Sequence, residues 1–319
     1  MIALPEQIPL EAIRAARGRI ADSAVRTPLV RLPGSDLPEI WLKLETLQPV
    51  GSFKLRGARN AIGGIDADAL ARGVYTASAG NMALGLAWCA QQRKIPFTAV
   101  VPEHAPTAKL SKLEQLGARI VRVPFERWWQ VLREHRFEDL DGSFVHPVAN
   151  VSVMAGNGTI GLEILEELPS VDTVLVPFGG GGLSCGIASA LAGLGSRARV
   201  VGCEIETATP LRTSLEAGAP CTVERTPSFV DGIGGAGLLP EMWPLVQRLI
   251  DSDAVVSLAE AAAAIRLLVE RVHVVAEGAG AVPLAAALSG RVTGRVVCCV
   301  ISGGNIDTAV LLDILANRF

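Results

Sequence analysis

The 319-residue sequence lacks the features that would place it in a membrane, outside the cell or on a nucleic acid. No apolar run reaches the roughly 18 residues that a membrane-spanning helix needs. The first twenty residues lack the charged start and apolar stretch of a secretory signal. The net charge is −3 and no basic stripe is visible, which argues against nucleic-acid binding. We therefore expect a cytoplasmic protein that contacts neither membranes nor nucleic acid.

Disulfide and metal-binding patterns are missing as well. The six cysteines form no CxxC pair, and the four histidines are scattered without a spacing such as HExxH. We expect buried, reduced thiols and ordinary packed histidines. Only 19% of the residues are charged and half are apolar, which excludes a disordered or fibrous chain and favours one large or two ordinary globular domains.

Short apolar runs alternate with helical stretches along the chain. The runs FTAVVP, TVLVPF and RVVCCVIS are typical of buried strands, and LAEAAAAIRLLVERV has the periodicity of a helix. This alternation predicts an α/β fold with mostly parallel sheets covered on both faces. Residues 73–148 show a compact β-α-β-α-β pattern. We expect a small domain there, inserted into a larger domain made of residues 1–72 and 149–319.

Three glycine-rich turns follow apolar strands, at residues 76–85, 176–186 and 300–307. Ligands bind beyond the carboxyl ends of parallel strands, so the three turns are expected to converge on one crevice. The second turn contains four consecutive glycines, residues 179–182, before a predicted helix. Backbone N–H groups in such a turn, together with the helix dipole, favour a bound phosphate.

A nucleotide site is the alternative interpretation of this turn. Glu204, at the end of the next predicted strand, imitates the acidic residue that binds a ribose. The GxGxxG pattern fails, however, because Ser184 stands where the third glycine belongs, and a Walker lysine is missing. The turn therefore favours a cofactor with a single phosphate.

Lysine is scarce, with five residues against 24 arginines. Lys94, Lys109 and Lys112 lie in polar surroundings and are expected on the surface, whereas Lys43 in a strand-like run is either paired or exposed at an edge. Lys54, in GSFKLRGA, has small neighbours that let a ligand lie against it. A desolvated lysine has a lowered pKa and attacks carbonyl groups. With a phosphate site, this favours a phosphorylated cofactor that carries an aldehyde.

Four motifs in order, GSFKLRGA, SAGN, GGGGL and SGGN, resemble the fold type II family of pyridoxal-phosphate enzymes. The resemblance is strongest to the serine/threonine dehydratases and serine racemases, and it extends from about residue 10 to the C-terminus. It implies a tryptophan synthase β-like fold of two α/β domains, pyridoxal 5'-phosphate as the cofactor, and a homodimer.

The resemblance also implies a role for each matching position. Lys54 would bind the cofactor covalently and later remove the Cα proton of the substrate. Asn81 would contact the phenolic oxygen of the cofactor and Ser302 its pyridine nitrogen. The cofactor-binding set is Phe53, Lys54, Asn81, Gly179, Gly180, Gly181, Gly182, Leu183 and Ser302. The substrate carboxylate would lie against Ser78, Ala79 and Gly80.

Some positions depart from this pattern near the expected substrate site. Ala79 stands where the racemases have a serine that acts as acid and base, so efficient racemisation is not expected. Met82 replaces a histidine that is usual in relatives. Trp128 and Trp129 form an adjacent pair, which indicates ordinary packing or an interface, or else a substrate site, with Trp129 in it, for a bulkier amino acid such as phenylserine.

Some members of the family bind a divalent cation near the stretch CEIETATP. Here Glu204 and the Ala208 carbonyl are weak candidate ligands, and Pro210 stands where a second acid is expected. We therefore predict no metal site.

These observations favour a pyridoxal-phosphate-dependent dehydratase, or ammonia-lyase. It would eliminate water from a β-hydroxy-α-amino acid of the L-threonine or L-serine type and yield a 2-oxo acid and ammonia. An amino-acid racemase or a β-replacement synthase of the same family is the first alternative. A non-catalytic protein that binds an amino acid or the cofactor is the second.

Overall fold

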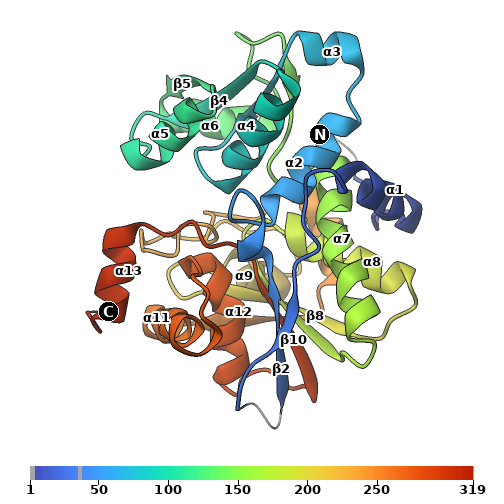
Figure 1. Ribbon diagram of the computed structural model, residues 1–319, viewed down its shortest axis with the longest axis vertical. Coiled ribbons are helices and arrows are strands. Elements are labelled where there is room, and N and C mark those ends of the chain that lie inside the picture. Colours follow the sequence, from blue (N-terminus) through green and yellow to red (C-terminus); the bar gives the residue numbers. More distant parts are fainter. Residues whose placement is uncertain (1–3, 35–37, 319) are drawn as a thin grey trace.

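The computed structural model describes residues 4–34 and 38–318, and its chain folds into two lobes (Figure 1). The lower lobe contains a six-stranded sheet in the order β1-β2-β10-β7-β8-β9. All neighbouring strands are parallel except β1, which pairs antiparallel with β2. The strands are β1 Leu29–Arg31, β2 Glu39–Leu44, β7 Thr173–Pro177, β8 Arg199–Ile205, β9 Ser252–Val256 and β10 Val296–Ile301.

The upper lobe contains a parallel four-stranded sheet in the order β5-β4-β3-β6. Its strands are β3 Val74–Ala77, β4 Phe97–Pro102, β5 Arg119–Val123 and β6 Ser143–Phe144. These strands come from one stretch of chain, placed between β2 and β7 of the large sheet. The predicted α/β fold with mostly parallel sheets is confirmed, and for the domain boundaries we propose the predicted residues 73 and 148.

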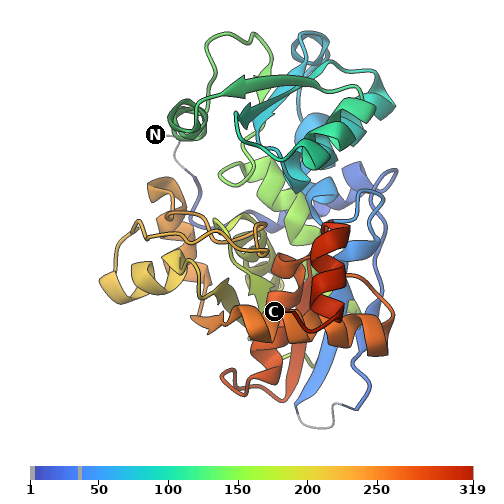
Figure 2. The same cartoon turned by 90° about the vertical axis from the view of Figure 1, so that its left-hand side faces the viewer.

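Helices cover the sheets of both lobes (Figures 1 and 2). The α-helices are α1 Leu10–Ile20, α2 Lys54–Gly63, α3 Ala67–Ala71, α4 Asn81–Arg93, α5 Thr107–Gln115, α6 Phe125–Glu134, α7 Val151–Glu167, α8 Gly182–Gly193, α9 Pro210–Ala217, α10 Trp243–Leu249, α11 Leu258–Leu267, α12 Gly278–Leu288 and α13 Thr308–Leu315. The short turns are the 3-10 helices η1 Glu45–Leu47 and η2 Pro240–Met242, and the π-helix η3 Leu268–Val272.

The apolar runs of the sequence become the centre of the lower lobe. Every residue of β7 is buried, as a parallel strand covered on both faces requires. Helices α7, α8 and α10 contribute to one apolar cluster, and α11 and α12 contribute to another with residues of the same sheet. Five of the six cysteines are buried and all six are free thiols, as predicted. In the described part of the chain, no helix is long and apolar enough to cross a membrane.

Helix α2 lies between the lobes and makes very close contacts on both sides. A Cβ atom on Gly156 of α7 would lie 2.4 Å from the Arg56 carbonyl oxygen, so only glycine permits the contact of α7 with α2. On the other side, a Cβ on Gly85 of α4 would lie 3.3 Å from the Lys54 carbonyl. Close packing of this kind fixes the position of α2, and therefore of the lysine that begins it.

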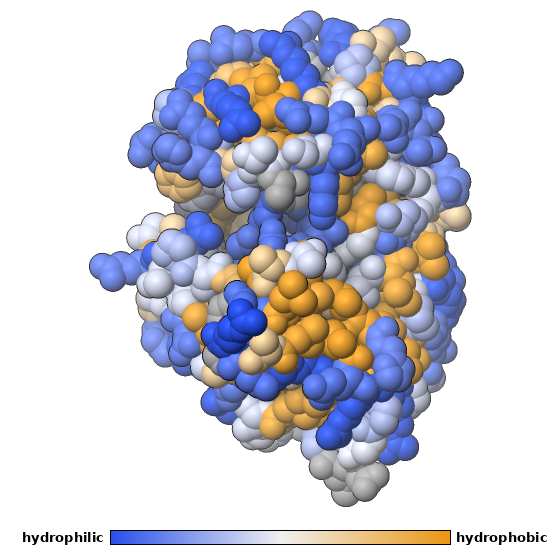
Figure 3. Space-filling view, turned by 60° about the vertical axis from the view of Figure 1, so that its left-hand side comes forward, coloured by the Kyte–Doolittle hydropathy of each residue, from blue (hydrophilic) through white to orange (hydrophobic). Residues whose placement is uncertain are grey.

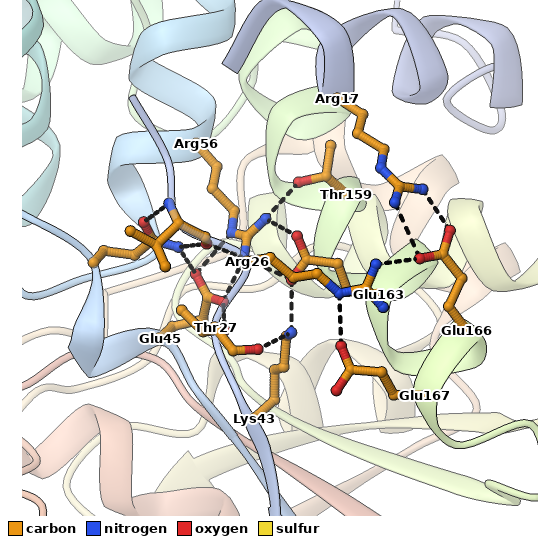
Figure 4. Close-up of polar contacts among 12 residues, drawn as sticks. Arg17, Arg26, Thr27, Lys43, Glu45, Arg56, Thr159, Glu163, Glu166 and Glu167 are labelled. Atoms are coloured by element: carbon orange, nitrogen blue, oxygen red, sulfur yellow. Dashed lines mark hydrogen bonds and ion pairs between the residues drawn. The ribbon is translucent and has the colours of Figure 1, made fainter. Parts of the chain in front are cut away.

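A buried cluster of charges anchors the same helix (Figure 4). The guanidinium of Arg56 bonds both oxygens of Glu45 and both oxygens of Glu163, at 2.7 to 2.8 Å. Lys43 is fully buried, donates to the Thr27 carbonyl at 2.7 Å and lies 2.6 Å from Glu163. Lys43 is therefore paired, which was one of its two predicted states. Two cations and two carboxylates balance, so burial leaves no net charge in the cluster.

Candidate active site

Lys54 is the first residue of α2, and its side chain is partly buried between the lobes. Its Nζ donates to the Pro147 carbonyl oxygen at 2.7 Å and lies 5.1 Å from the centre of the Phe53 ring. Burial without a carboxylate partner lowers the pKa of Lys54 to about 8. A substantial fraction of the amine is therefore neutral near pH 8, as nucleophilic attack on a carbonyl requires.

The four glycines connect β7 to α8 in a turn where side chains at positions 180–182 would be obstructed or strained. Gly181 has φ +90°, in the region that favours glycine. A Cβ on Gly180 would lie 2.9 Å from a methyl of Val148, and one on Gly182 would lie 3.0 Å from the Val148 carbonyl oxygen. Helix α8 has twelve residues and begins at Gly182. This turn, at the positive end of a helix, suits an anion such as phosphate. Leu183 follows on α8 and is buried.

Asn81, the first residue of α4, connects the two lobes. Its Nδ2 donates to Oε1 of Glu277 at 2.7 Å, and its Oδ1 accepts from Nδ2 of Asn305 at 2.9 Å. Asn305 also donates to the Val50 carbonyl at 2.8 Å. The network fixes which way the Asn81 amide points and leaves one of its N–H groups for a ligand.

The segment around Lys54 is bonded to the turn after β10. The Phe53 N–H donates to the Ser302 carbonyl at 2.9 Å, and Ser52 pairs with Gly303 in an antiparallel bridge. Ser302 is buried. The Ser52 hydroxyl is also buried and finds no hydrogen-bond partner in the described part of the chain. Two motifs about 250 residues apart in the sequence are thus held together through their backbones.

A cavity of about 80 Å³ lies beside Asn81, between the lobes. Figure 3 shows an indentation of the surface between the two lobes. Lys109 Nζ lies 2.5 Å from Asp231 at this cavity, so the two residues join the upper lobe to the lower one. The lining residues are Ala79, Gly80, Asn81, Leu84, Lys109, Lys112, Leu113, Asp231, Gly232, Glu277 and Asn305. Lys109 and Lys112, expected as ordinary surface charges, thus line this cavity together with Asp231, for which the sequence held no signal.

Glu277 is the other residue that sequence reasoning missed. It lies directly before α12 and is 8% exposed. Burial, with a smaller contribution from Asp231, raises the pKa of Glu277 to about 7. The available signal was an acid between the apolar HVVA and the small-residue GAGA, a place where a charge needs a buried partner. Its partner Asn81 is 196 positions away in the sequence.

The predicted substrate residues fall in different surroundings. Ala79 and Gly80 line the cavity, and the Ser78 hydroxyl accepts the Gly80 N–H at 3.2 Å, which shapes the turn before α4. Met82 is 1% exposed and belongs to an apolar core of the upper lobe. The structure brings Ala79 and Gly80 to the cavity, Ser78 to the turn beside it and Met82 to the core, so contacts of these residues with substrate stay predictions.

Trp128 and Trp129 lie on α6 with ring centres 6.2 Å apart. The ring centres of Trp128 and Phe125 are 5.6 Å apart. Both tryptophans pack on an apolar cluster of the upper lobe that includes Tyr75 and Phe137. Neither ring lines the cavity beside Asn81. This placement agrees with ordinary packing, and a substrate role for Trp129 stays a prediction.

Glu204, the weak candidate for a metal ligand, caps a helix. Its two carboxylate oxygens accept the N–H groups of Leu211 and Arg212 at 2.7 and 2.9 Å, in the first turn of α9. Ala208 is buried and its N–H donates to Ile205. Burial raises the pKa of Glu204 to about 7. Within the described residues, no group of three or more His, Cys, Asp or Glu side chains could hold a metal ion.

The geometry therefore suits a cofactor with an aldehyde and one phosphate. The desolvated Lys54 amine bonds the Pro147 carbonyl, and the next residue, Val148, packs against Gly180 and Gly182 of the glycine turn. Two residues before the lysine, the buried Ser52 hydroxyl has no hydrogen-bond partner among the described residues. The chain belongs to the pyridoxal-phosphate dependent enzymes, the family whose sequence profile matches residues 20–303. The predicted family and its cofactor are thus confirmed.

Individual relatives narrow the class further. The chain is 41% identical to the L-threonine ammonia-lyase of Thermotoga maritima over 98% of its own length and 79% of that protein. It is 34% identical to the serine racemase of Oryza sativa subsp. japonica, over 97% of this chain and 94% of that one. The structure of maize serine racemase superposes with a TM-score of 0.89 and 32% identity, covering 97% of each chain.

Proposed function

We propose that this enzyme is an ammonia-lyase that eliminates water from a β-hydroxy-α-amino acid and yields a 2-oxo acid and ammonia. The observation that carries the proposal is the Lys54 amine between the lobes, bonded to the Pro147 carbonyl and with its pKa lowered to about 8. Ala79, which lines the cavity beside Asn81, stands where the racemases would have their second acid and base. Position 79 thus offers no second acid or base to return a proton to Cα. The similarity to an L-threonine ammonia-lyase supports the same reading.

Pyridoxal phosphate supplies an electron sink that stabilises negative charge at the substrate Cα. Lys54 would take the Cα proton, and its carbonyl acceptor on Pro147 holds Nζ in place for that task. Ser302 is predicted to face the pyridine nitrogen. A hydroxyl does not keep that nitrogen protonated as a carboxylate would, so the sink is weaker. A weaker sink favours rapid loss of a β-substituent over a long-lived carbanion.

The substrate carboxylate would lie at the beginning of α4. This helix has thirteen residues and begins at Asn81, directly after Ser78, Ala79 and Gly80. Free backbone N–H groups and the positive end of the helix dipole favour an anion there. Holding the carboxylate at one end would turn the Cα–H bond toward Lys54, which is the orientation that proton transfer needs.

The test is an incubation with L-serine, L-threonine and threo-phenylserine. We expect 2-oxo acid and ammonia in equal amounts from serine or threonine, with little D-isomer. D-isomer without 2-oxo acid would contradict the proposal and favour the racemase alternative, which the similarity to serine racemases supports. Bound cofactor without turnover of any substrate would favour the non-catalytic alternative. Turnover of phenylserine alone would identify a bulkier substrate.

We also propose that the enzyme works in the cytoplasm as a homodimer. An apolar area on the lower lobe (Figure 3) is the kind of surface that a second copy would cover. Sedimentation of the purified protein measures its oligomeric state directly.

A further inference from the structure

His146 lies after β6, directly before a bend at residues 147–149. Its Nδ1 is 3.0 Å from the backbone nitrogen of Val148 and 2.7 Å from that of Ala149. Both backbone groups are N–H donors, so Nδ1 must be the unprotonated acceptor. The proton of the neutral ring is therefore on Nε2, and a single side chain holds two consecutive N–H groups of the bend.

The bend held by His146 touches both halves of the cofactor site. The Pro147 carbonyl accepts the hydrogen bond from Lys54 Nζ at 2.7 Å. Val148 lies so close to Gly180 and Gly182 that Cβ atoms there would be 2.9 and 3.0 Å from it. A change in the bend would therefore move the acceptor of the lysine and one wall of the glycine turn together.

The surroundings of His146 keep its ring neutral. The side chain is 1% exposed and stacks on His135 with ring centres 4.4 Å apart, and the ring of Phe144 meets it edge-on at 5.9 Å. Burial lowers the pKa of His146 to about 3, with smaller contributions in the same direction from the neighbouring His135 and Lys54. Protonation would place a hydrogen on Nδ1 and break both bonds of the bend, and this environment opposes it.

We propose that His146 is a positioning residue for the cofactor lysine: its imidazole fixes the 147–149 bend, and the bend aligns Lys54 with the glycine turn. The proposal rests on the proposed role of Lys54 as the cofactor-binding amine. It assigns a task to a histidine that contacts neither the lysine nor the glycines through a hydrogen bond of its own.

The test compares three variants of the holoenzyme. His146→Leu removes the acceptor at similar size, whereas His146→Asn supplies a carbonyl oxygen of the kind that accepts N–H groups two or three residues ahead. Asn150→Leu is the matched control, because the Asn150 side chain accepts the Val153 N–H at 3.0 Å to cap α7 and does not hold the N–H groups of Val148 and Ala149. Its backbone N–H, which bonds the Val148 carbonyl, is kept in this variant. The measurements are the dissociation constant of pyridoxal phosphate, the pH titration of its visible absorption band, and the unfolding temperature.

We expect His146→Leu to weaken cofactor binding roughly tenfold, as the loss of buried hydrogen bonds implies, and to shift the titration of the absorption band. His146→Asn should recover most of this loss. Asn150→Leu should lower the unfolding temperature but leave the cofactor affinity and the spectrum as in the wild type. An equal loss of affinity in Asn150→Leu would reduce the effect to instability and overturn the proposal.

Unchanged affinity and spectrum in a folded His146→Leu protein would also overturn it. If His146→Leu does not fold, His146→Gln replaces it, because the longer side chain keeps a buried amide but moves the acceptor away from the two N–H groups. Wild-type affinity in that variant would contradict the proposal. These readouts need no substrate. A failure of the ammonia-lyase proposal would appear in the products, and a failure of this one in the binding of the cofactor.

Discussion

Lys54 and Arg56 are two residues apart on α2, and the helix places them in opposite electrostatic surroundings. Arg56 lies among two carboxylates, the Thr159 hydroxyl and the Val25 carbonyl (Figure 4). Burial alone would lower its pKa, but Glu45 and Glu163 raise it above the usual arginine value. Lys54 has one carbonyl acceptor, and burial lowers its pKa to about 8. The cation with buried counter-charges stays charged and structural, while the cation without them is available for chemistry.

Removal of the reactive cation should give the largest effect. Lys54→Ala is expected to lower 2-oxo acid formation by at least about a thousandfold, because both the covalent attachment and the base are lost. The visible absorption of the lysine-bound cofactor should disappear with it. Lys94→Asn, which keeps a residue suited to the left-handed φ of 54° at this exposed position, is the control. Normal turnover by Lys54→Ala would contradict the whole assignment.

Removal of the structural cation should act on stability instead. Arg56→Leu leaves Glu45 and Glu163 buried with less compensation, so the free energy of unfolding should fall by about 3 to 5 kcal/mol. Urea denaturation of the purified variant measures this loss. If the free energy of unfolding decreased by less than about 1 kcal/mol, the buried carboxylates would have found other partners or taken up protons.

The contrast also predicts that Lys54 makes its own contribution to the pH dependence of stability. Its pKa is lowered from 10.5 to about 8 in the folded chain. Between these values the unfolded chain binds a proton that the folded chain does not. By itself, Lys54 should therefore make the free energy of unfolding of the apoprotein rise with pH over that range. The buried thiols, whose pKa values burial raises, act in the opposite direction, so the rise is isolated by comparison with a variant. Lys54→Met should remove this rise, and urea titrations of both apoproteins from pH 8 to 10 compare them. Parallel curves would contradict the lowered pKa.

The smallest effect is expected at the exposed edge of the charged cluster. Arg17 pairs with Glu166 on the surface, where both side chains are about 40% exposed or more. Arg17→Ala should change the free energy of unfolding by less than about 1 kcal/mol, because water and salt screen such a pair. The same urea experiment, repeated at high salt, checks it. A loss as large as that of Arg56→Leu would mean that burial does not separate the two kinds of pair.

Much of the site could be predicted because its main parts carry local patterns. Four consecutive glycines and a lysine among small residues each have a physical reason at their own position, and strand order brings them together. Glu277 and Asp231 had no such pattern, because the role of each depends on a partner far away in the sequence, Asn81 for Glu277 and Lys109 for Asp231. The Pro147 carbonyl could not be found at all, since a backbone acceptor leaves no mark on the residue type.

The same limit explains the residues whose roles stayed open. Met82 and Trp129 were singled out because they differ from relatives or are rare in composition. Apolar side chains of this size fit a core as readily as a pocket, and periodicity alone does not separate the two. Lys43 shows the converse, because its place in a strand-like run left pairing and exposure equally open until Glu163 of α7 was found beside it.

The glycine contacts of α2 decide where this enzyme can be redesigned. A methyl group at position 156 has no space, because the Arg56 carbonyl oxygen would lie 2.4 Å from it. A methyl group at position 57 would lie 2.8 Å from a methyl of Val153. The side of the crevice that carries the lysine is therefore closed to substitution at these glycines. Leu84 and Leu113, on α4 and α5, line the cavity with ordinary side chains. Libraries aimed at larger or smaller amino acids should vary those two positions and leave the glycines untouched.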